Sequence, residues 1–171
     1  IVYLREQNSF LRSLWGQSVK GVSRSCRSFA EFMDNLDRHP YVWNYSLFLR
    51  DWQEVFGSQS LNACVFDRQA FHKGDLISDF SHKIGVPVRN NSRRLRKKKN
   101  VSPSFEELEN IRLDNIARRD LNSDQFSKTP MSPETIDPVV YGERVIRLVS
   151  DSNAWVNENI LSSQNIKLPV A

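Results

Sequence analysis

Residues 1–21 constrain the fold most strongly, because their pattern predicts a strand that leads directly into a helix. Residues 1–4 form a β-branched and aromatic run, which is typical of a buried strand. After Arg5, mostly apolar side chains recur at helical spacing, which places them along one side of a helix: Phe10, Leu11, Leu14, Trp15, Ser18 and Val19. A strand followed by a helix is half of a βαβ unit, so we expect a parallel sheet in an α/β fold.

Two polar residues in this segment form a candidate anion site. Arg5 ends the predicted strand, and ligands of open α/β sheets bind at the carboxyl ends of strands. Ser13 follows eight residues later, two turns into the helix. A guanidinium supplies a permanent, bidentate charge and a hydroxyl supplies one more donor, so this pair can grip one phosphate. The alternative is an ion pair between Arg5 and Glu6, with Ser13 facing solvent or bonding its own backbone.

The rest of the chain combines predicted helices with one more strand, over residues 61–66. Ser28 and Glu31 form a capping-box pattern, and Asp75 and Ser102 are predicted N-caps of later helices. A helix over 42–56 is expected to bury Tyr45, Phe48, Leu49, Trp52, Val55 and Phe56. The helix after Asp75 carries Leu76, Ile77, Phe80 and Ile84, and a last helix is expected over about 139–161. The tryptophans are interpreted as core residues.

Positive charge is concentrated in one segment. Residues 89–99 contain seven Arg and Lys side chains and no acid, although the whole chain has a formal net charge of only +4. The remaining chain is therefore mildly acidic. Residues 86–102 contain few apolar side chains, which predicts an exposed basic loop.

In this order, the motifs resemble those of sulfotransferases that use 3'-phosphoadenosine 5'-phosphosulfate. In that family, a strand ending in Arg leads into a helix bearing Ser eight positions on, and the pair binds the 3'-phosphate of the nucleotide. Arg5 and Ser13 occupy the matching positions. Three later segments also resemble the family. Its helix that ends in Trp and Phe-Gly matches residues 49–57, and its strand that ends in an acidic residue and Arg matches residues 62–68. Its helix that begins with Gly-Asp-Leu matches residues 74–80. The resemblance covers residues 1–118, and a weaker similarity is found at residues 151–155.

The resemblance implies a parallel sheet flanked by helices, as in the P-loop NTPases, and transfer of sulfate to an acceptor hydroxyl or amine. The Trp-Gln-Glu-Val-Phe-Gly helix is closer to the bacterial and carbohydrate-type members, which points to a glycan acceptor. The family's basic loop folds over the nucleotide, so Arg94, Arg96 and Lys97 become candidate phosphate ligands. The Gly-containing form of that loop is not reproduced in this chain. The nucleotide is the cosubstrate, and no metal is implied.

The family's phosphate loop and general base lie upstream of the strand that ends in Arg, and no such loop precedes Ile1. We therefore expect residues 1–118 to be the C-terminal part of such a domain. Residues 119–171 are expected to be a linker and a helix packed on it. We expect that this chain alone does not complete sulfate transfer. Its sequence indicates no catalytic residue.

The composition limits which other functions and cellular compartments are compatible with the chain. Two cysteines, Cys26 and Cys64, are too few for a disulfide framework and favour a reducing, cytoplasmic compartment. No apolar run is long enough to span a bilayer, and three scattered histidines give no metal-ligand spacing. Two alternatives stay open: a non-catalytic nucleotide-binding or interaction domain, and a nucleic-acid-binding module that uses the basic loop. The second is disfavoured because no aromatic side chains are interleaved with the basic ones.

Overall fold

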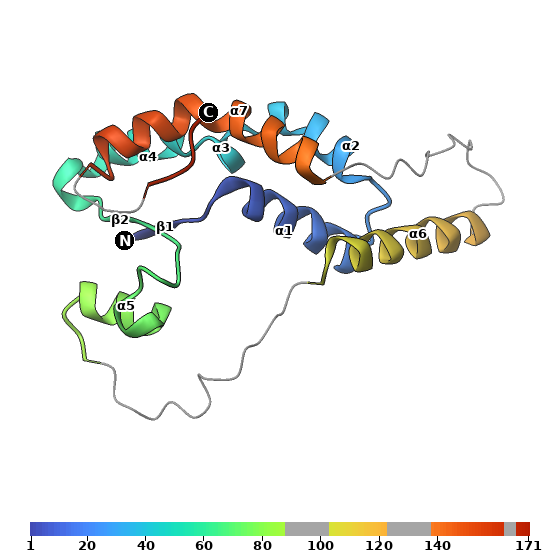
Figure 1. Cartoon of the computed structure of the whole chain (residues 1–171), viewed down its shortest axis with the longest axis horizontal. Coiled ribbons are helices and arrows are strands. Elements are labelled where there is room, and N and C mark those ends of the chain that lie inside the picture. The colour runs from blue at the N-terminus through green and yellow to red at the C-terminus, as the bar shows by residue number, and fades with distance from the viewer. Residues whose placement is uncertain (88–102, 123–137, 163–166) are drawn as a thin grey trace.

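The computed structural model describes residues 1–87, 103–122, 138–162 and 167–171, and it is mostly helical with one small parallel sheet (Figure 1). The sheet pairs β1 (Val2–Leu4) with β2 (Ala63–Val65), in a register that places Val2 beside Ala63 and Leu4 beside Val65. The predicted parallel α/β arrangement is thus confirmed in a minimal form. The strands predicted over residues 1–4 and 61–66 are each three residues long in the structure.

The helices between the two strands begin and end close to the predicted positions. α1 spans Gln7–Lys20, α2 spans Phe29–Asp34, and a 3-10 turn follows at Leu36–Arg38. The capping box is confirmed: the Ser28 hydroxyl accepts the Glu31 N–H, and the Glu31 carboxylate accepts the Ser28 N–H. The predicted helix 42–56 is instead split into α3 (Pro40–Trp43) and α4 (Tyr45–Phe56), because Asn44 adopts an extended backbone.

Five helical segments follow α4 in the described residues. Two are short 3-10 turns, at Ser58–Ser60 before β2 and at His72–Gly74 after it. The others are α5 (Leu76–Lys83), capped by Asp75 as predicted, and α6 (Phe105–Asn122); α7 (Pro138–Asn159) is the last helix. The predicted N-cap of α6 is wrong. Ser104 takes that role, because its hydroxyl accepts the Glu107 N–H while the Glu107 carboxylate accepts the Ser104 N–H.

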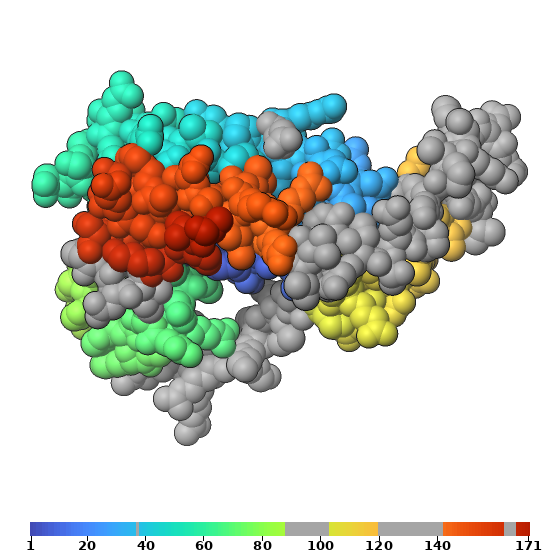
Figure 2. Space-filling view, turned by 45° about the horizontal axis from the view of Figure 1, so that its top comes forward, coloured from blue at the N-terminus to red at the C-terminus, as the bar shows by residue number. Residues whose placement is uncertain are grey.

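Two apolar clusters hold these elements together, and α7 takes part in both. The first joins α1, α2, α6 and α7 around Leu11, Trp15 and Val149. The second joins the sheet to α4 and α7 through Leu4, Leu49 and Val156. α4 and α7 therefore cover one face of the sheet, while α5 lies on the other (Figure 1). In the space-filling view, α7 lies across the molecule and α5 forms a distinct lobe below it (Figure 2).

Two predicted apolar faces are more exposed than expected. In α4, Tyr45 and Leu49 are buried against α7, but Val55 is 73% exposed and Phe56 is 65% exposed. The prediction that Trp52 lies in the core is also wrong. Among the described residues, no element covers Val55 and Phe56 at the end of α4. On α5 and at its C-cap, four large apolar side chains are exposed: Leu76, Ile77, Phe80 and Ile84. The side chain that α5 buries is the carboxylate of Asp79.

No helix within the described ranges is both long and apolar enough to cross a membrane. The same part of the chain contains no group of three His, Cys, Asp or Glu side chains arranged to hold a metal ion.

Candidate anion-binding pocket

The start of α1 fixes the backbone beside Arg5. The Glu6 carboxylate caps the helix by accepting the N–H groups of Asn8, at 2.7 Å, and Ser9, at 2.8 Å. The alternative of an Arg5–Glu6 ion pair is therefore not what the structure contains. The Tyr45 hydroxyl donates a hydrogen bond of 2.7 Å to the Arg5 carbonyl, which ties the end of β1 to α4. Burial raises the pKa of Tyr45, and the charge of Glu6 raises it further, so the hydroxyl stays protonated as a donor.

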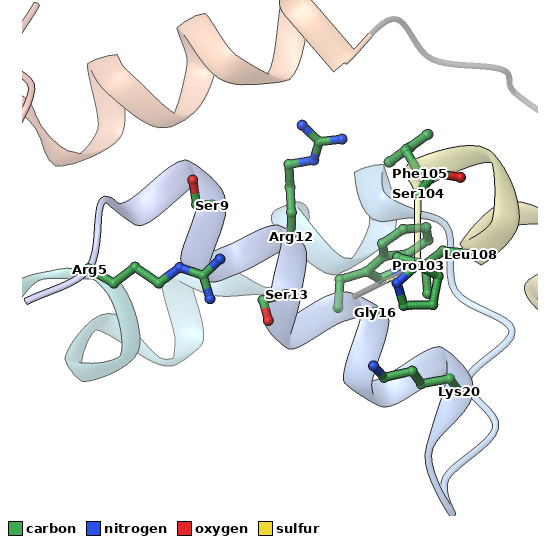
Figure 3. Close-up of a pocket in the computed structure, with 11 residues that line it drawn as sticks. Arg5, Ser9, Arg12, Ser13, Gly16, Lys20, Pro103, Ser104, Phe105 and Leu108 are labelled. Carbon is green, nitrogen blue, oxygen red and sulfur yellow. The ribbon is translucent and has the colours of Figure 1, made fainter. Parts of the chain in front are cut away.

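A pocket of about 250 Å³ lies along α1 and the first turn of α6 (Figure 3). Its charged lining is entirely cationic and consists of Arg5, Arg12 and Lys20. Hydroxyl groups line it as well, and they belong to Ser9, Ser13 and Ser104. The apolar lining comes from Trp15, Phe105 and Leu108. Since none of the described residues that line the pocket carries a carboxylate, its field favours an anion.

The polar side chains of α1 lie along two edges of this pocket. Figure 3 shows the Arg5 side chain running along the helix toward Ser13, with Lys20 reaching back from the far end on the same edge. Ser9 and Arg12 point toward the opposite edge. The Arg12 guanidinium lies over the Phe105 ring, 5.4 Å from its centroid, and the Ser9 hydroxyl donates to Glu6. Arg12 and Ser9 are thus engaged within the protein.

Arg5 and Ser13 differ from these two residues because their polar groups are free. In the described part of the chain, neither the Arg5 guanidinium nor the Ser13 hydroxyl forms a hydrogen bond or an ion pair. Both side chains are half-buried, so each has already lost part of its hydration. A phosphate or sulfate oxygen would supply the missing partners with charge-assisted hydrogen bonds.

Close packing of α6 on α1 forms the wall of the pocket. Gly16 allows it, because a Cβ at that position would lie 2.8 Å from Leu108 Cδ1. Further along α6, the Asn115 amide donates to the Val19 carbonyl at 2.9 Å, at the end of α1. Arg112 is 1% exposed and pairs with Glu109, while it also donates to the Cys26 carbonyl at 3.1 Å. These bonds fix the loop after α1.

The structure thus brings two of the predicted ligands, Arg5 and Ser13, into one pocket. The other three, Arg94, Arg96 and Lys97, lie outside the described residues. Sequence reasoning missed Lys20 and the hydroxyl of Ser104. The helical repeat would have revealed Lys20, because it lies seven residues after Ser13 and therefore on nearly the same face of α1.

A second polar cluster lies between the sheet and α5, on the face of the sheet that α4 and α7 do not cover. Asp79 is 3% exposed and accepts hydrogen bonds from the Tyr3 hydroxyl at 2.6 Å and the His72 N–H at 2.9 Å. Lys83 adds an ion pair at 2.9 Å. Beside this cluster, the His72 ring stacks on the His82 ring, with the ring centroids 4.3 Å apart. Both carboxylate oxygens of Asp79 thus have partners within the protein, which favours a structural role.

Comparison with known proteins adds little to these observations. No family model matches the chain, and no solved structure shows significant similarity to it. Over 89 residues the chain is 29% identical to an uncharacterized protein of Archaeoglobus fulgidus, which covers 52% of this chain and 22% of that protein. The matched part thus spans about a fifth of that relative's length. This similarity assigns neither a family nor an activity.

Proposed function

We propose that the protein is a sulfotransferase-type domain that binds 3'-phosphoadenosine 5'-phosphosulfate and takes part in transferring its sulfate to an acceptor hydroxyl or amine. The observation that supports it best is that Arg5 and Ser13 line one cationic pocket, and that neither polar group has a partner among the described residues. In this proposal they bind the 3'-phosphate of the nucleotide. The order of motifs along residues 1–118 gives the nucleotide its identity, through their resemblance to this family.

The chemistry of sulfuryl transfer suits such a site. Charge spreads over the equatorial oxygens in a loose transition state, as in phosphoryl transfer, so positioning and cationic donors supply most of the catalysis. Arg5 and Ser13 would contribute by holding the nucleotide in place. We propose a glycan as the acceptor, and we assign no residue of this chain to proton transfer.

The small sheet is also part of the proposal. The bonds from the Val2 N–H to the Asn62 carbonyl and from the Phe66 N–H to the Leu4 carbonyl show that Val2 and Leu4 use their backbone groups toward β2. The N–H and C=O of Tyr3 therefore point to the other edge of β1. Together with the exposed apolar side chains of α5, this free edge supports a larger parallel sheet, flanked by helices, of the P-loop-NTPase-like kind.

Calorimetric titration tests the nucleotide site directly. We expect adenosine 3',5'-bisphosphate to bind more tightly than adenosine 5'-monophosphate, and we expect Arg5→Gln to remove this difference. Loss of the charge-assisted pair should cost about 2–5 kcal/mol of binding free energy. Equal affinities for the two nucleotides in the unmodified protein would refute the sulfotransferase proposal and would favour an interaction or nucleic-acid-binding role.

A further inference from the structure

The edge of the pocket that contains Arg5 and Ser13 carries a third polar group, Lys20, which the resemblance did not indicate. Lys20 lies seven residues after Ser13, so the two side chains leave α1 on nearly the same face, about 10 Å apart along the axis. In Figure 3 the Lys20 amine points back along the helix, so that Arg5 and Lys20 approach Ser13 from opposite ends.

Nothing in the described residues neutralises this charge. Lys20 forms no ion pair in the described ranges, and no carboxylate lines the pocket beside it. Two cations therefore share the space around one free hydroxyl. A single negative charge would leave this edge with an uncompensated cation, whereas two negative charges on one group would balance it.

We propose that Lys20 is a third ligand of the same anion as Arg5 and Ser13, and that it makes the pocket select a doubly charged phosphate monoester over a singly charged diester. This inference rests on the proposed function, because it assigns a charge preference to the same phosphate site. A terminal phosphate has a second pKa near 6 and carries close to two charges at pH 7.5, whereas a cyclic phosphate carries one. The ligand class is therefore a nucleotide with a free terminal phosphate at the ribose.

Lys20 also lies in the last turn of α1, where any cation offsets the partial negative charge of the helix end. That structural role would not discriminate between two ligands with the same nucleoside. Selectivity between a monoester and a cyclic diester therefore separates the two roles.

The test is a calorimetric titration at pH 7.5 with adenosine 3'-monophosphate and adenosine 2',3'-cyclic phosphate. The unmodified protein should prefer the monoester by about tenfold, the effect of one charge-assisted hydrogen bond. In Lys20→Gln, affinity for the monoester should fall about tenfold and affinity for the cyclic diester should stay within about twofold. Lys73→Gln is the matched control, since Lys73 is exposed in the turn before α5 and lies outside the pocket. It should change neither affinity.

Arg5→Gln separates failure of this inference from failure of the proposed function. If Arg5→Gln weakens both probes while Lys20→Gln weakens them equally or not at all, the phosphate site stands and the role of Lys20 is refuted. If the unmodified protein binds neither probe, the proposed function is refuted and the role of Lys20 falls with it.

Discussion

Protonation of Asp79 should weaken the packing of α5 against the sheet. Burial alone would raise the pKa of Asp79, but hydrogen bonds from Tyr3, the His72 N–H and Lys83 outweigh it and lower the pKa to about 2. Because the folded-state pKa lies below the unfolded value near 3.8, the stabilisation is fully present above about pH 4. It is lost as the pH falls toward 2.

The size of this effect follows from the pKa difference and from exposure. Each pKa unit corresponds to about 1.4 kcal/mol, so the full difference between 3.8 and about 2 would contribute about 2.5 kcal/mol. The Lys83 side chain is 26% exposed, so solvent screens part of the interaction. We therefore expect the unmodified protein to lose about 1–2 kcal/mol of unfolding free energy between pH 4 and pH 2 through this carboxylate.

Urea unfolding followed by tryptophan fluorescence measures this loss. Asp79→Asn should be about 1–2 kcal/mol less stable than the unmodified protein at pH 7, and the difference should vanish near pH 2. Asp151→Asn, an exposed site on α7, is the control and should leave the pH dependence unchanged. A constant difference between Asp79→Asn and the unmodified protein from pH 7 to pH 2 would refute the reasoning.

Two further predictions concern the core. Gln7 and Asn153 are almost fully buried and exchange hydrogen bonds of 2.5 and 3.1 Å between α1 and α7. Gln7→Leu should leave the Asn153 amide oxygen without a donor, although the Asn153 amide nitrogen still donates to the Pro169 carbonyl, and should cost about 1–3 kcal/mol in urea unfolding. A loss below about 0.5 kcal/mol would contradict this. Leu49→Ala should cost about 2–5 kcal/mol, whereas Val55→Ala, on the exposed end of α4, should change stability by less than about 0.5 kcal/mol. Equal losses at the two sites would show that the end of α4 is packed.

Local signals in the sequence identified the elements well. Ser28 with Glu31 and Asp75 marked helix starts, because capping depends on residues within a few positions of each other. The run before Arg5 and the run around Cys64 predicted the two strands, and the helix that follows the first strand implied a parallel sheet, which the structure contains. The same local reasoning placed Arg5 and Ser13 on one side of α1.

Features that depend on tertiary contacts were not accessible in this way. Periodicity alone predicted that Val55 and Phe56 are buried, but burial requires a neighbouring element, and no described element covers that end of α4. The role of Glu6 as the N-cap of α1 was missed because its neighbour Arg5 offered a simpler ion pair. The approach of α6 to α1 through Gly16 joins residues about ninety positions apart, which no local pattern encodes.

The central claim is that Arg5 and Ser13 bind one and the same phosphate. A double-mutant cycle with Arg5→Gln and Ser13→Ala, measured by calorimetric titration of adenosine 3',5'-bisphosphate, tests it most directly. We predict that each variant alone weakens binding and that the double variant loses clearly less than the sum of the two losses, with a coupling of about 0.5–3 kcal/mol. Losses that add without coupling, or no loss in either variant, would contradict the account.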